Sequence, residues 1–424
     1  MNKKFLQHWM FKINARTAHA LLALAFALTF AVMLAQGAQA QTYTVLYTFT
    51  GSTDGGWPYA GVILDDSGNM YGTTETRGDV KACGAFHGCG VVYKLDTSGN
   101  ETVLHTFEGN SDGRQPQWGN LFRDKAGNLW DTTVYGGIKG DIGLGVVYKL
   151  TNTGKETILH RFAGGPNDGE EPQTGLIQDK DGTFYGTTAA GGSGPYGDCG
   201  TVFKMSKSGK ITILHSFVIT DGCQPEGGLV MDASGNMYGV TTSGGSAGYG
   251  TVYKITKTGT VTTLHSFTGQ PDGAFPLGIL AIDKAGNLYG TTPNGGDPKC
   301  TTEQQGCGIV FEIDTHGKEH ILHSFLAAEG GLPYAGVVLD AVGNLYGSTS
   351  GFSTYNWGSL FKLDKRGNFT KLHDFTGGAD GGFPFAAMTL DKSGTFYGTT
   401  YLGGMSGGCD YGQGCGVVFQ LTLQ

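Results

Sequence analysis

Short apolar segments recur along the chain with a period of about fifty residues. Each repeat contains four of them, and in the first repeat they lie at residues 61–64, 71–74, 91–95 and 102–107. The segments are rich in Val, Ile, Leu, Tyr, Phe and Thr and are bounded by Gly, Asp or Asn, which predicts short β-strands. Several segments have apolar residues on both alternating sets of positions, so we expect sheets that are covered on both faces.

Three polar sequence motifs, which we call words, connect these segments. Asp-x-x-Gly-Asn joins the first two, as at residues 65–69, and Thr-Ser-Gly joins the last two, as at residues 97–99. Both words are typical of tight hairpins, because Gly supplies a positive φ and Asp bonds its own backbone. The third word, Asp-Gly-x-x-Pro, opens each of the seven repeats, with Glu in place of Asp once: Asp54, Asp112, Asp168, Asp221, Asp272, Glu329 and Asp380.

Self-similarity at this period predicts a propeller or a solenoid. The seventh repeat ends after its third segment, residues 417–421, whereas residues 44–49 match a fourth segment that has no repeat before it. The N-terminal strand would therefore complete the last blade and close a ring, which removes the exposed edges of an open array. We predict an all-β fold, a seven-bladed β-propeller of four-stranded antiparallel blades closed by the N-terminal strand in blade seven.

Residues 1–40 have the pattern of a signal peptide. Lys and Arg lie near the start, residues 20–35 are apolar apart from Thr29, and residues 38–40 read Ala-Gln-Ala, which fits a cleavage site. The apolar run is shorter than the roughly 18–20 residues of a spanning helix. The alternative to a cleaved signal peptide is a segment that is retained as an N-terminal anchor. We predict a mature chain of one propeller domain, residues 41–424, that has no membrane span, is monomeric, and is secreted to the periplasm or the medium.

The charge of the chain bears on its partners. Removing the leader takes away four Lys and Arg residues and no acid, so the formal net charge changes from −8 to −12. Nucleic acids need a basic surface that displaces the counterions of the phosphates. We therefore expect no nucleic-acid partner.

Eight cysteines in a chain with a predicted leader favour disulfides over metal sites. Six of them form pairs that are close in sequence: Cys83/Cys89, Cys300/Cys307 and Cys409/Cys415. Cys199 occupies the same slot, directly before a Gly, as the second member of each pair, and it has no near partner. We predict that Cys199 bonds Cys223 in the next Asp-Gly-x-x-Pro loop. No Cys-x-x-Cys motif occurs, so we predict no metal site at the cysteines.

Several words recur together in one order. Gly-Gly-Leu-Val-x-Asp, Gly-Asn-Leu-Tyr-Gly-Thr-Thr, Gly-Thr-Val-Phe-Lys-Leu and Leu-His-Ser-Phe appear, with small variations, at residues 227–242, 250–255 and 264–267. The combination resembles the GloVer tandem repeat of exported bacterial proteins, over residues 42–423. The resemblance implies export and a repeat fold, and it implies no activity and no catalytic residue. That family carries varied C-terminal surface anchors, and none follows the seventh repeat here, so we expect release of the chain.

The connections from fourth to first segment and from second to third segment should share one face, where we expect any ligand site. The second-to-third loops vary most and carry aromatic residues: Phe86, Tyr196, Tyr249, Tyr355, Trp357 and Tyr411. The seven acidic residues of the Asp-Gly-x-x-Pro words, together with Trp357, form the candidate ligand face. Seven carboxylates around a channel would suit Ca²⁺. We favour the alternative, in which each carboxylate caps its own turn and no cofactor is needed.

A histidine recurs in the fourth segment of six repeats, with Tyr47 in the seventh place: His105, His160, His215, His265, His323 and His373. Because these histidines belong to different blades, we expect packing or blade-to-blade hydrogen bonds and no shared metal. An enzyme would need a departure from the repeat. Candidates are the Trp130-Asp131 pair, which replaces Tyr-Gly in blade two, and the loop singletons His87, Glu303, Trp357 and Asp410. None forms a recognised catalytic motif.

We predict an exported, non-catalytic binding module, with extracellular or cell-envelope carbohydrate as the ligand class, since aromatic and amide-rich loops suit sugar rings. One alternative is an extracellular hydrolase or lyase at the channel mouth, which an irregular pair of acidic or His residues there would support. Another is a structural envelope or adhesion protein that a protein partner recognises, which a contiguous exposed apolar patch would support.

Overall fold

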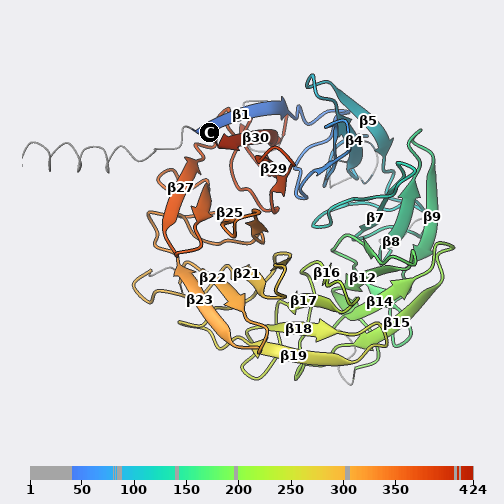
Figure 1. Ribbon diagram of the computed structural model, residues 1–424. Coiled ribbons are helices and arrows are strands. Elements are labelled where there is room, and N and C mark those ends of the chain that lie inside the picture. Colours follow the sequence, from blue (N-terminus) through green and yellow to red (C-terminus); the bar gives the residue numbers. More distant parts are fainter. Residues whose placement is uncertain are drawn as a thin grey trace, which may run out of the picture. The chain divides into compact units, whose positions relative to one another are not determined.

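The computed structural model describes residues 41–423 except 80, 82, 84–87, 139–142, 195–198, 301–305, 405–407 and 410–411. The predicted leader, residues 1–40, lies outside the described residues. Within Tyr43–Thr422, seven four-stranded antiparallel sheets follow one another around a ring (Figure 1). The fold is all-β, and the residues described form no helix that could span a membrane. The predicted seven-bladed β-propeller is confirmed.

The innermost strand of each blade is two residues long, and the three that follow have five to eight residues. The first strands are β2 (Ile63–Leu64), β6 (Phe122–Arg123), β11 (Ile177–Gln178), β16 (Val230–Met231), β20 (Ala281–Ile282), β24 (Val338–Leu339) and β28 (Thr389–Leu390). The second strands are β3 (Met70–Thr74), β7 (Leu129–Thr133), β12 (Phe184–Thr188), β17 (Met237–Thr241), β21 (Leu288–Thr292), β25 (Leu345–Thr349) and β29 (Thr395–Thr400).

The third strands are almost completely buried, which fits their apolar sequences. They are β4 (Val91–Leu95), β8 (Val146–Leu150), β14 (Thr201–Met205), β18 (Thr251–Ile255), β22 (Ile309–Ile313), β26 (Ser359–Leu363) and β30 (Val417–Leu423). The fourth strands lie at the periphery of the ring (Figure 1): β5 (Glu101–Thr106), β9 (Glu156–Arg161), β15 (Ile211–Ser216), β19 (Val261–Ser266), β23 (Glu319–Ser324), β27 (Phe369–Asp374) and β1 (Gln41–Thr48).

The N-terminal strand closes the ring, as the sequence predicts. The order of strands in blade seven is β1-β30-β29-β28, so β1 supplies the fourth strand that the C-terminal repeat lacks. The Phe49 N–H donates to the Gly416 carbonyl oxygen at 3.1 Å, which continues the pairing beyond β1. The chain thus joins its two ends by hydrogen bonds within one sheet, and β1 covers the edge of β30 that would otherwise be unpaired.

One aromatic contact repeats between all neighbouring blades. The Phe after each fourth strand meets the aromatic residue of the next third strand edge-to-face, with ring centroids 5.0–5.8 Å apart. The Gly of the second strand leaves room for that ring. A Cβ at Gly72, for example, would lie 2.4 Å from the Tyr93 hydroxyl. The Tyr-Gly-Thr-Thr word therefore contains Gly because the core of the blade needs the space.

The two kinds of variable loop lie together on one face of the ring, as expected. In every blade the Asp-Gly-x-x-Pro loop pairs with the segment after the second strand, either as a single bridge such as Gly56 with Thr76 or as the short ladder of β10 (Gly169–Glu170) and β13 (Ala190–Gly191). The tight hairpins form the opposite face. There an Asp such as Asp65 accepts bonds from Asn69 and from the Tyr71 hydroxyl, and this arrangement repeats with variations around the ring.

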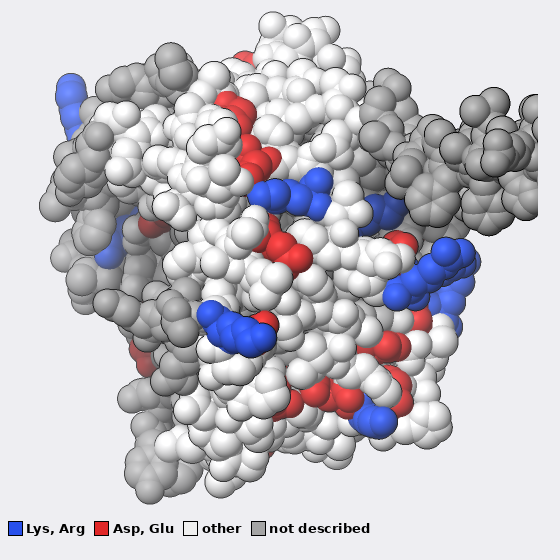
Figure 2. Space-filling model, turned by 90° about the vertical axis from the view of Figure 1, so that its left-hand side faces the viewer, with Lys and Arg blue, Asp and Glu red and all other residues white. Residues whose placement is uncertain are grey.

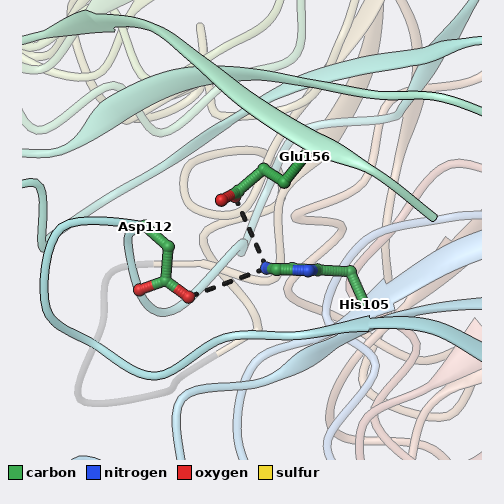
Figure 3. A group of neighbouring side chains, drawn as sticks. All are labelled: His105, Asp112 and Glu156. Carbon is green, nitrogen blue, oxygen red and sulfur yellow. Dashed lines mark ion pairs between the residues drawn. The ribbon is translucent and has the colours of Figure 1, made fainter.

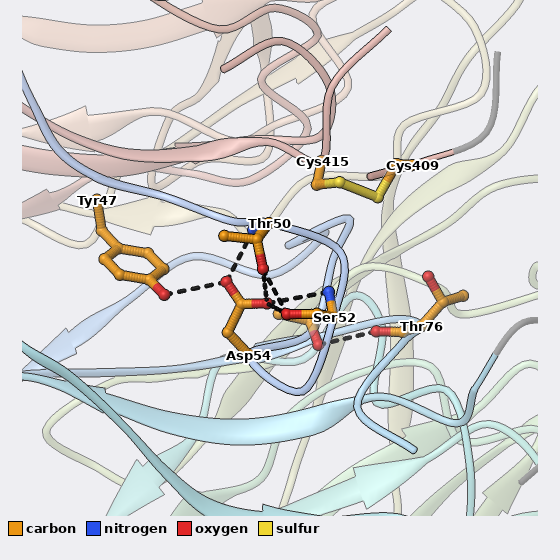
Figure 4. The surroundings of a disulfide bond; sticks show 8 residues. Tyr47, Thr50, Ser52, Asp54, Thr76, Cys409 and Cys415 are labelled. Carbon is orange, nitrogen blue, oxygen red and sulfur yellow. Dashed lines mark hydrogen bonds between the residues drawn. A yellow bond between two sulfur atoms is a disulfide. The ribbon is translucent and has the colours of Figure 1, made fainter. Parts of the chain in front are cut away.

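All four predicted disulfides are present: Cys83–Cys89, Cys199–Cys223, Cys300–Cys307 and Cys409–Cys415. Cys199–Cys223 joins the second-to-third loop of blade three to the loop that enters blade four. Figure 4 shows Cys409–Cys415 beside the loop that enters blade one, where Thr50 and Ser52 bond Asp54. Because cytosolic proteins rarely keep disulfides, the four bonds indicate folding in an oxidising compartment.

Candidate functional site

The residue before the proline has an unusual conformation in all seven loops. Its φ lies between 53° and 59°, a region that residues other than Gly rarely adopt, at Trp57, Gln115, Glu171, Gln224, Phe275, Leu332 and Phe383. Its N–H donates to a carbonyl of the preceding blade at 2.8–3.1 Å in every case. Backbone bonds therefore hold the strained residue in place, and the side chain at this position is free to differ from blade to blade.

The residue after the proline varies as well. It is Tyr59, Gln117, Gln173, Glu226, Leu277, Tyr334 and Phe385 in the order of the blades. Each of these residues begins the approach to an innermost strand and is half-buried. These positions surround the ring axis on the loop face, and we call this region the channel mouth. Because their side chains differ, the channel mouth does not have the sevenfold repetition of the rest of the fold.

Aromatic rings gather on one part of the channel mouth. The Tyr59 ring stacks on the Phe385 ring with centroids 4.7 Å apart, and the centroids of the Tyr59 and Trp118 rings are 4.1 Å apart. Tyr401 meets Tyr59 edge-to-face at 5.2 Å, and Tyr334 lies 5.7 Å from Phe385. Blades one, two, six and seven supply these five half-buried rings. Together they form a continuous apolar surface with polar edges, a type of surface that suits flat ligands.

A carboxyl group lies beside the aromatic rings. Glu75 follows β3 and takes the position that other blades fill with Val134, Ala189 or Thr242. Its Oε1 accepts hydrogen bonds from Gln117 Nε2 at 2.7 Å and from Gln115 Nε2 at 3.3 Å. Burial raises the pKa of Glu75 above its ordinary value, although these bonds act in the opposite direction. The amides hold the carboxyl group in one orientation.

A second carboxyl group is contributed by blade four. The Thr242 hydroxyl donates to Glu226 Oε2 at 2.9 Å. Burial raises the pKa of Glu226, and the nearby charge of Glu171 raises it further. Burial and the charges of Glu75 and Glu226 together raise the pKa of Tyr59. The channel mouth thus combines aromatic rings with acidic groups whose protons are held more tightly than in water.

A small cavity lies among the residues of the channel mouth. It has a volume of about 30 Å³ and is lined among others by Trp118, Asn120, Glu226 and Tyr334, and it has room for roughly one water molecule. Wider grooves of about 480 and 460 Å³ lie on the hairpin face, between the first hairpins of neighbouring blades. Their turn carboxylates, such as Asp65, already accept several hydrogen bonds. The channel mouth is therefore the better candidate for recognition.

The acidic residues of the Asp-Gly-x-x-Pro words lie elsewhere. In every blade the carboxylate accepts a bond of 2.6–3.1 Å from the backbone N–H that follows the strand-four Phe. In five blades it also lies within 3.2 Å of the strand-four histidine, and Tyr47 donates to Asp54 at 3.0 Å. The structure places these carboxylates against the outer strands, and a role for them in ligand binding stays a prediction.

Trp357, the other predicted ligand residue, packs within the loops. Its ring lies 4.9 Å from Phe383, and a Cβ at Gly377 would come 2.1 Å from its indole. Four other blades have a disulfide cysteine at this slot, so Trp357 fills the place of a disulfide. Among the remaining candidates, Tyr249 packs on Phe275 and Tyr355 is exposed. Others lie outside the described residues: Phe86, His87, Tyr196, Glu303, Asp410 and Tyr411.

Asp131, which breaks the repeat in blade two, is fully buried opposite Tyr148. Burial raises its pKa well above the ordinary value, and its Oδ1 has no hydrogen-bond partner. Its neighbour Trp130 donates from Nε1 to Asp124 at 3.0 Å, in the place of the usual Tyr hydroxyl. Both side chains are buried in the blade, and a Cβ at Gly119, next to Trp118, would lie 2.8 Å from Asp131 Oδ1.

Among the residues that the structure describes, two groups at the outer strands bring together a histidine and two carboxylates. They are His105 with Asp112 and Glu156, and His265 with Asp272 and Glu319. Figure 3 shows the first group, in which the three side chains point toward one another. Burial and the neighbouring Asp112 raise the pKa of Glu156 to about 7. The histidines of different blades do not meet one another, as expected. The pattern of histidines alone does not indicate the third member of each group, the glutamate that starts the next fourth strand.

On the face of the molecule in Figure 2, acidic and basic residues lie interspersed among uncharged ones.

Other positions that the sequence did not single out are Glu75, Glu226 and the aromatic residues of the channel mouth. A comparison of the same slot in all seven repeats would have shown them, because each differs from its counterparts.

Solved structures share this fold at low sequence identity. The chain is 14% identical to the extracellular domain assigned to a hybrid two-component system of B. thetaiotaomicron, with a TM-score of 0.51, covering 89% of this chain and 41% of that one. It is 15% identical to a gluconolactonase from Xanthomonas campestris, with a TM-score of 0.45, covering 91% and 90% of the two chains. At these identities the likeness concerns the fold alone. No curated protein matches the chain in sequence.

The repeated words themselves find a match. The Gloeobacter/Verrucomicrobia repeat matches residues 31–197, 80–302 and 299–424, which together cover all seven blades. These stretches contain the features described above: the strand-two Gly that accommodates the core ring, the loop with its strained residue before proline, and the strand-four histidine. By its sequence and by the structural role of the recurring residues, the chain belongs to the Gloeobacter/Verrucomicrobia repeat family.

Proposed function

We propose that this propeller is an exported carbohydrate-binding module whose site is the channel mouth. The observation that supports this most strongly is the grouping of five aromatic rings, among them Tyr59 and Trp118, beside the hydrogen-bonded carboxyl group of Glu75. Sugar rings present apolar C–H faces that pack on aromatic rings, and hydroxyl groups that bond carboxylates and amides. A rigid scaffold with variable loops presents both kinds of group at little cost in conformational entropy.

The charge of the channel mouth restricts the class of glycan. Glu75, Glu171 and Glu226 are acidic, whereas the basic residues Arg77 and Arg114 of the same loops lie over the rings of Trp57 and Tyr135. Like charges facing each other across an interface oppose binding. The ligand is therefore a neutral or amino-sugar polymer, and polyuronates are disfavoured.

Affinity electrophoresis tests the proposal. The mature chain is run through gels that contain neutral glycans, amino-sugar polymers or polyuronates, and we expect retardation by a member of the first two classes. The variants Tyr59→Ala and Glu75→Gln should bind about tenfold more weakly. Tyr355→Ala is the matched control, because Tyr355 is an exposed aromatic residue of the same face that lies outside the aromatic group. Retardation by no glycan, or equal binding by all variants, would refute the proposal.

A hydrolase or lyase is the second candidate, and one observation favours it. Glu75 and Glu226 both have a raised pKa and both lie at the channel mouth, and a carboxyl group of this kind suits general acid catalysis. The same glycan panel, incubated with the protein and assayed for new reducing ends, separates the two functions. Release that Glu226→Gln abolishes while binding persists supports an enzyme; retardation without release supports the binding module.

A further inference from the structure

The outer edge of each blade interface has a position that covers the strand-four histidine. It is the first residue of the next fourth strand in the repeat pattern: Tyr43, Glu101, Glu156, Ile211, Val261, Glu319 and Phe369. Where it is aromatic, its ring stacks on the imidazole, as Phe369 does on His323 at 4.6 Å and Tyr43 does on His373 at 3.9 Å. A glutamate therefore occupies, at some interfaces, a position that packing alone fills with an apolar or aromatic side chain.

The side chains are further apart at the interface of blades one and two. His105 Nε2 lies 3.4 Å from Glu156 Oε1 and 3.7 Å from Asp112 Oδ2. In the four blades whose neighbour supplies an apolar or aromatic residue, the histidine lies 2.9–3.0 Å from its carboxylate. The group around His105 is thus spread apart relative to its counterparts.

Polar atoms of the same group lack hydrogen-bond partners. His105 Nε2, Asp112 Oδ1 and Glu156 Oε1 are buried and make no hydrogen bond. Buried polar atoms are normally satisfied, so three such atoms in one group call for an explanation. Two carboxyl groups that face one imidazole also form an acidic group whose charge a divalent cation would neutralise.

We propose that His105, Asp112 and Glu156 form a Zn²⁺ site that links blades one and two. One imidazole nitrogen and two carboxylate oxygens are a donor set that Zn²⁺ accepts. Bonds of about 2.0–2.2 Å in a tetrahedron place the ligand atoms roughly 3.3–3.6 Å apart, close to the 3.4 and 3.7 Å found here. Water takes the fourth position. Ca²⁺ fits less well, because it prefers six to eight oxygen ligands.

A second group of the same composition lies at the interface of blades four and five. His265 Nε2 is 3.1 Å from Asp272 Oδ1, and Glu319 offers the third donor within 4.8 Å of both. The equivalent position at the interface of blades seven and one provides an internal control. There Glu101 has Tyr47 in place of the histidine, so the nitrogen donor is missing. We infer that each of the two complete groups binds one Zn²⁺ and that the incomplete one binds none.

Equilibrium dialysis of the chelator-treated protein against Zn²⁺ measures the stoichiometry. We expect two equivalents for the wild-type chain, one for Glu156→Gln, and none for the variant that combines Glu156→Gln with Glu319→Gln. Glu101→Gln should still take up two equivalents, and it controls for the loss of a buried carboxylate at this position. Co²⁺ provides a spectroscopic check, because tetrahedral binding gives visible absorption that Glu156→Gln should reduce by half.

A Zn²⁺ ion that links two blades should also stabilise the folded chain, which can be measured without counting ions. Since Zn²⁺ binds the folded chain, it should raise the melting temperature of the wild-type protein and of Glu101→Gln, but not that of the double variant. All variants keep the residue size at an outer position, and circular dichroism of the ion-free proteins verifies their folding. No uptake by the wild-type chain, or uptake that survives in the double variant, would overturn the proposal.

Discussion

Replacing Phe49 with Ala tests how firmly the N-terminal strand closes the ring. Phe49 is fully buried, and its ring meets Tyr93 of blade one edge-to-face at 5.1 Å. Truncation of a buried Phe lowers the free energy of unfolding by about 3–5 kcal/mol, of which the edge-to-face contact contributes about 0.5–1.5 kcal/mol. We expect the full loss, because the side chain lies in the core between blades seven and one.

The matched control is Phe267→Ala. Phe267 occupies the same position in blade four, is also fully buried, and meets Phe311 at 5.2 Å. Blade four is built from one continuous stretch of chain, whereas blade seven joins both ends. Urea unfolding followed by circular dichroism gives the free energy for both variants. The two losses should agree within about 1 kcal/mol, since the contacts are equivalent.

A smaller loss for Phe49→Ala would refute this reasoning. If this variant lost less than about 1 kcal/mol while Phe267→Ala lost the full amount, β1 would contribute little to the stability of blade seven. The ring would then be held together by the contacts of blades one to six. A larger loss at Phe49 than at Phe267 would also contradict the expected equivalence, because it would mean that closure is cooperative with the whole ring.

Three further predictions concern loops and charge. Gln224→Gly should be about 1 kcal/mol more stable than Gln224→Ala in urea unfolding, because the backbone at Gln224 has φ 59° and only Gly adopts it without strain; equal stabilities would argue against strain. Replacing Cys199 and Cys223 with Ser should lower the free energy of unfolding by about 3–4 kcal/mol, since the bond closes a loop with a sequence separation of 24, and a change below about 1 kcal/mol would contradict this. Burial and the charge of Asp54 raise the pKa of Glu101 from 4.5 to about 7, so the folded chain keeps a proton that the unfolded chain releases, and stability falls as pH rises through this interval. Because Glu101 is half-exposed, the loss of unfolding free energy is limited to about 1 kcal/mol. The melting temperatures at pH 5 and pH 8 should differ less in Glu101→Gln than in the wild type. An unchanged difference would show that Glu101 does not cause this pH dependence.

The fold could be predicted because its causes repeat. Each blade needs the same short strands, the same Gly beneath a core ring and the same tight hairpins, so seven copies report one structure. The closure by β1 followed from counting, since one strand was missing at one end and spare at the other. The Cys199–Cys223 bond followed in the same way, from two cysteines without a near partner.

The candidate site could not be predicted from repetition. Glu75, Trp118 and Tyr401 come from three different blades, and only the ring geometry brings them together. The seven acidic residues recur, and each bonds the end of a fourth strand, so their recurrence alone does not identify a ligand site. Likewise, Glu156 stands about fifty residues after His105, in the next repeat, so no local motif joins the pair.

The strained residue before each proline has a consequence for how such proteins change over time. Its conformation is held by backbone atoms, so the side chain can differ between blades, and two of these residues, Gln224 and Phe275, expose an amide and a phenyl ring. A substitution there alters the displayed chemistry and leaves the scaffold intact. The surface chemistry of the propeller can therefore change one loop at a time, at the positions where this side chain is exposed.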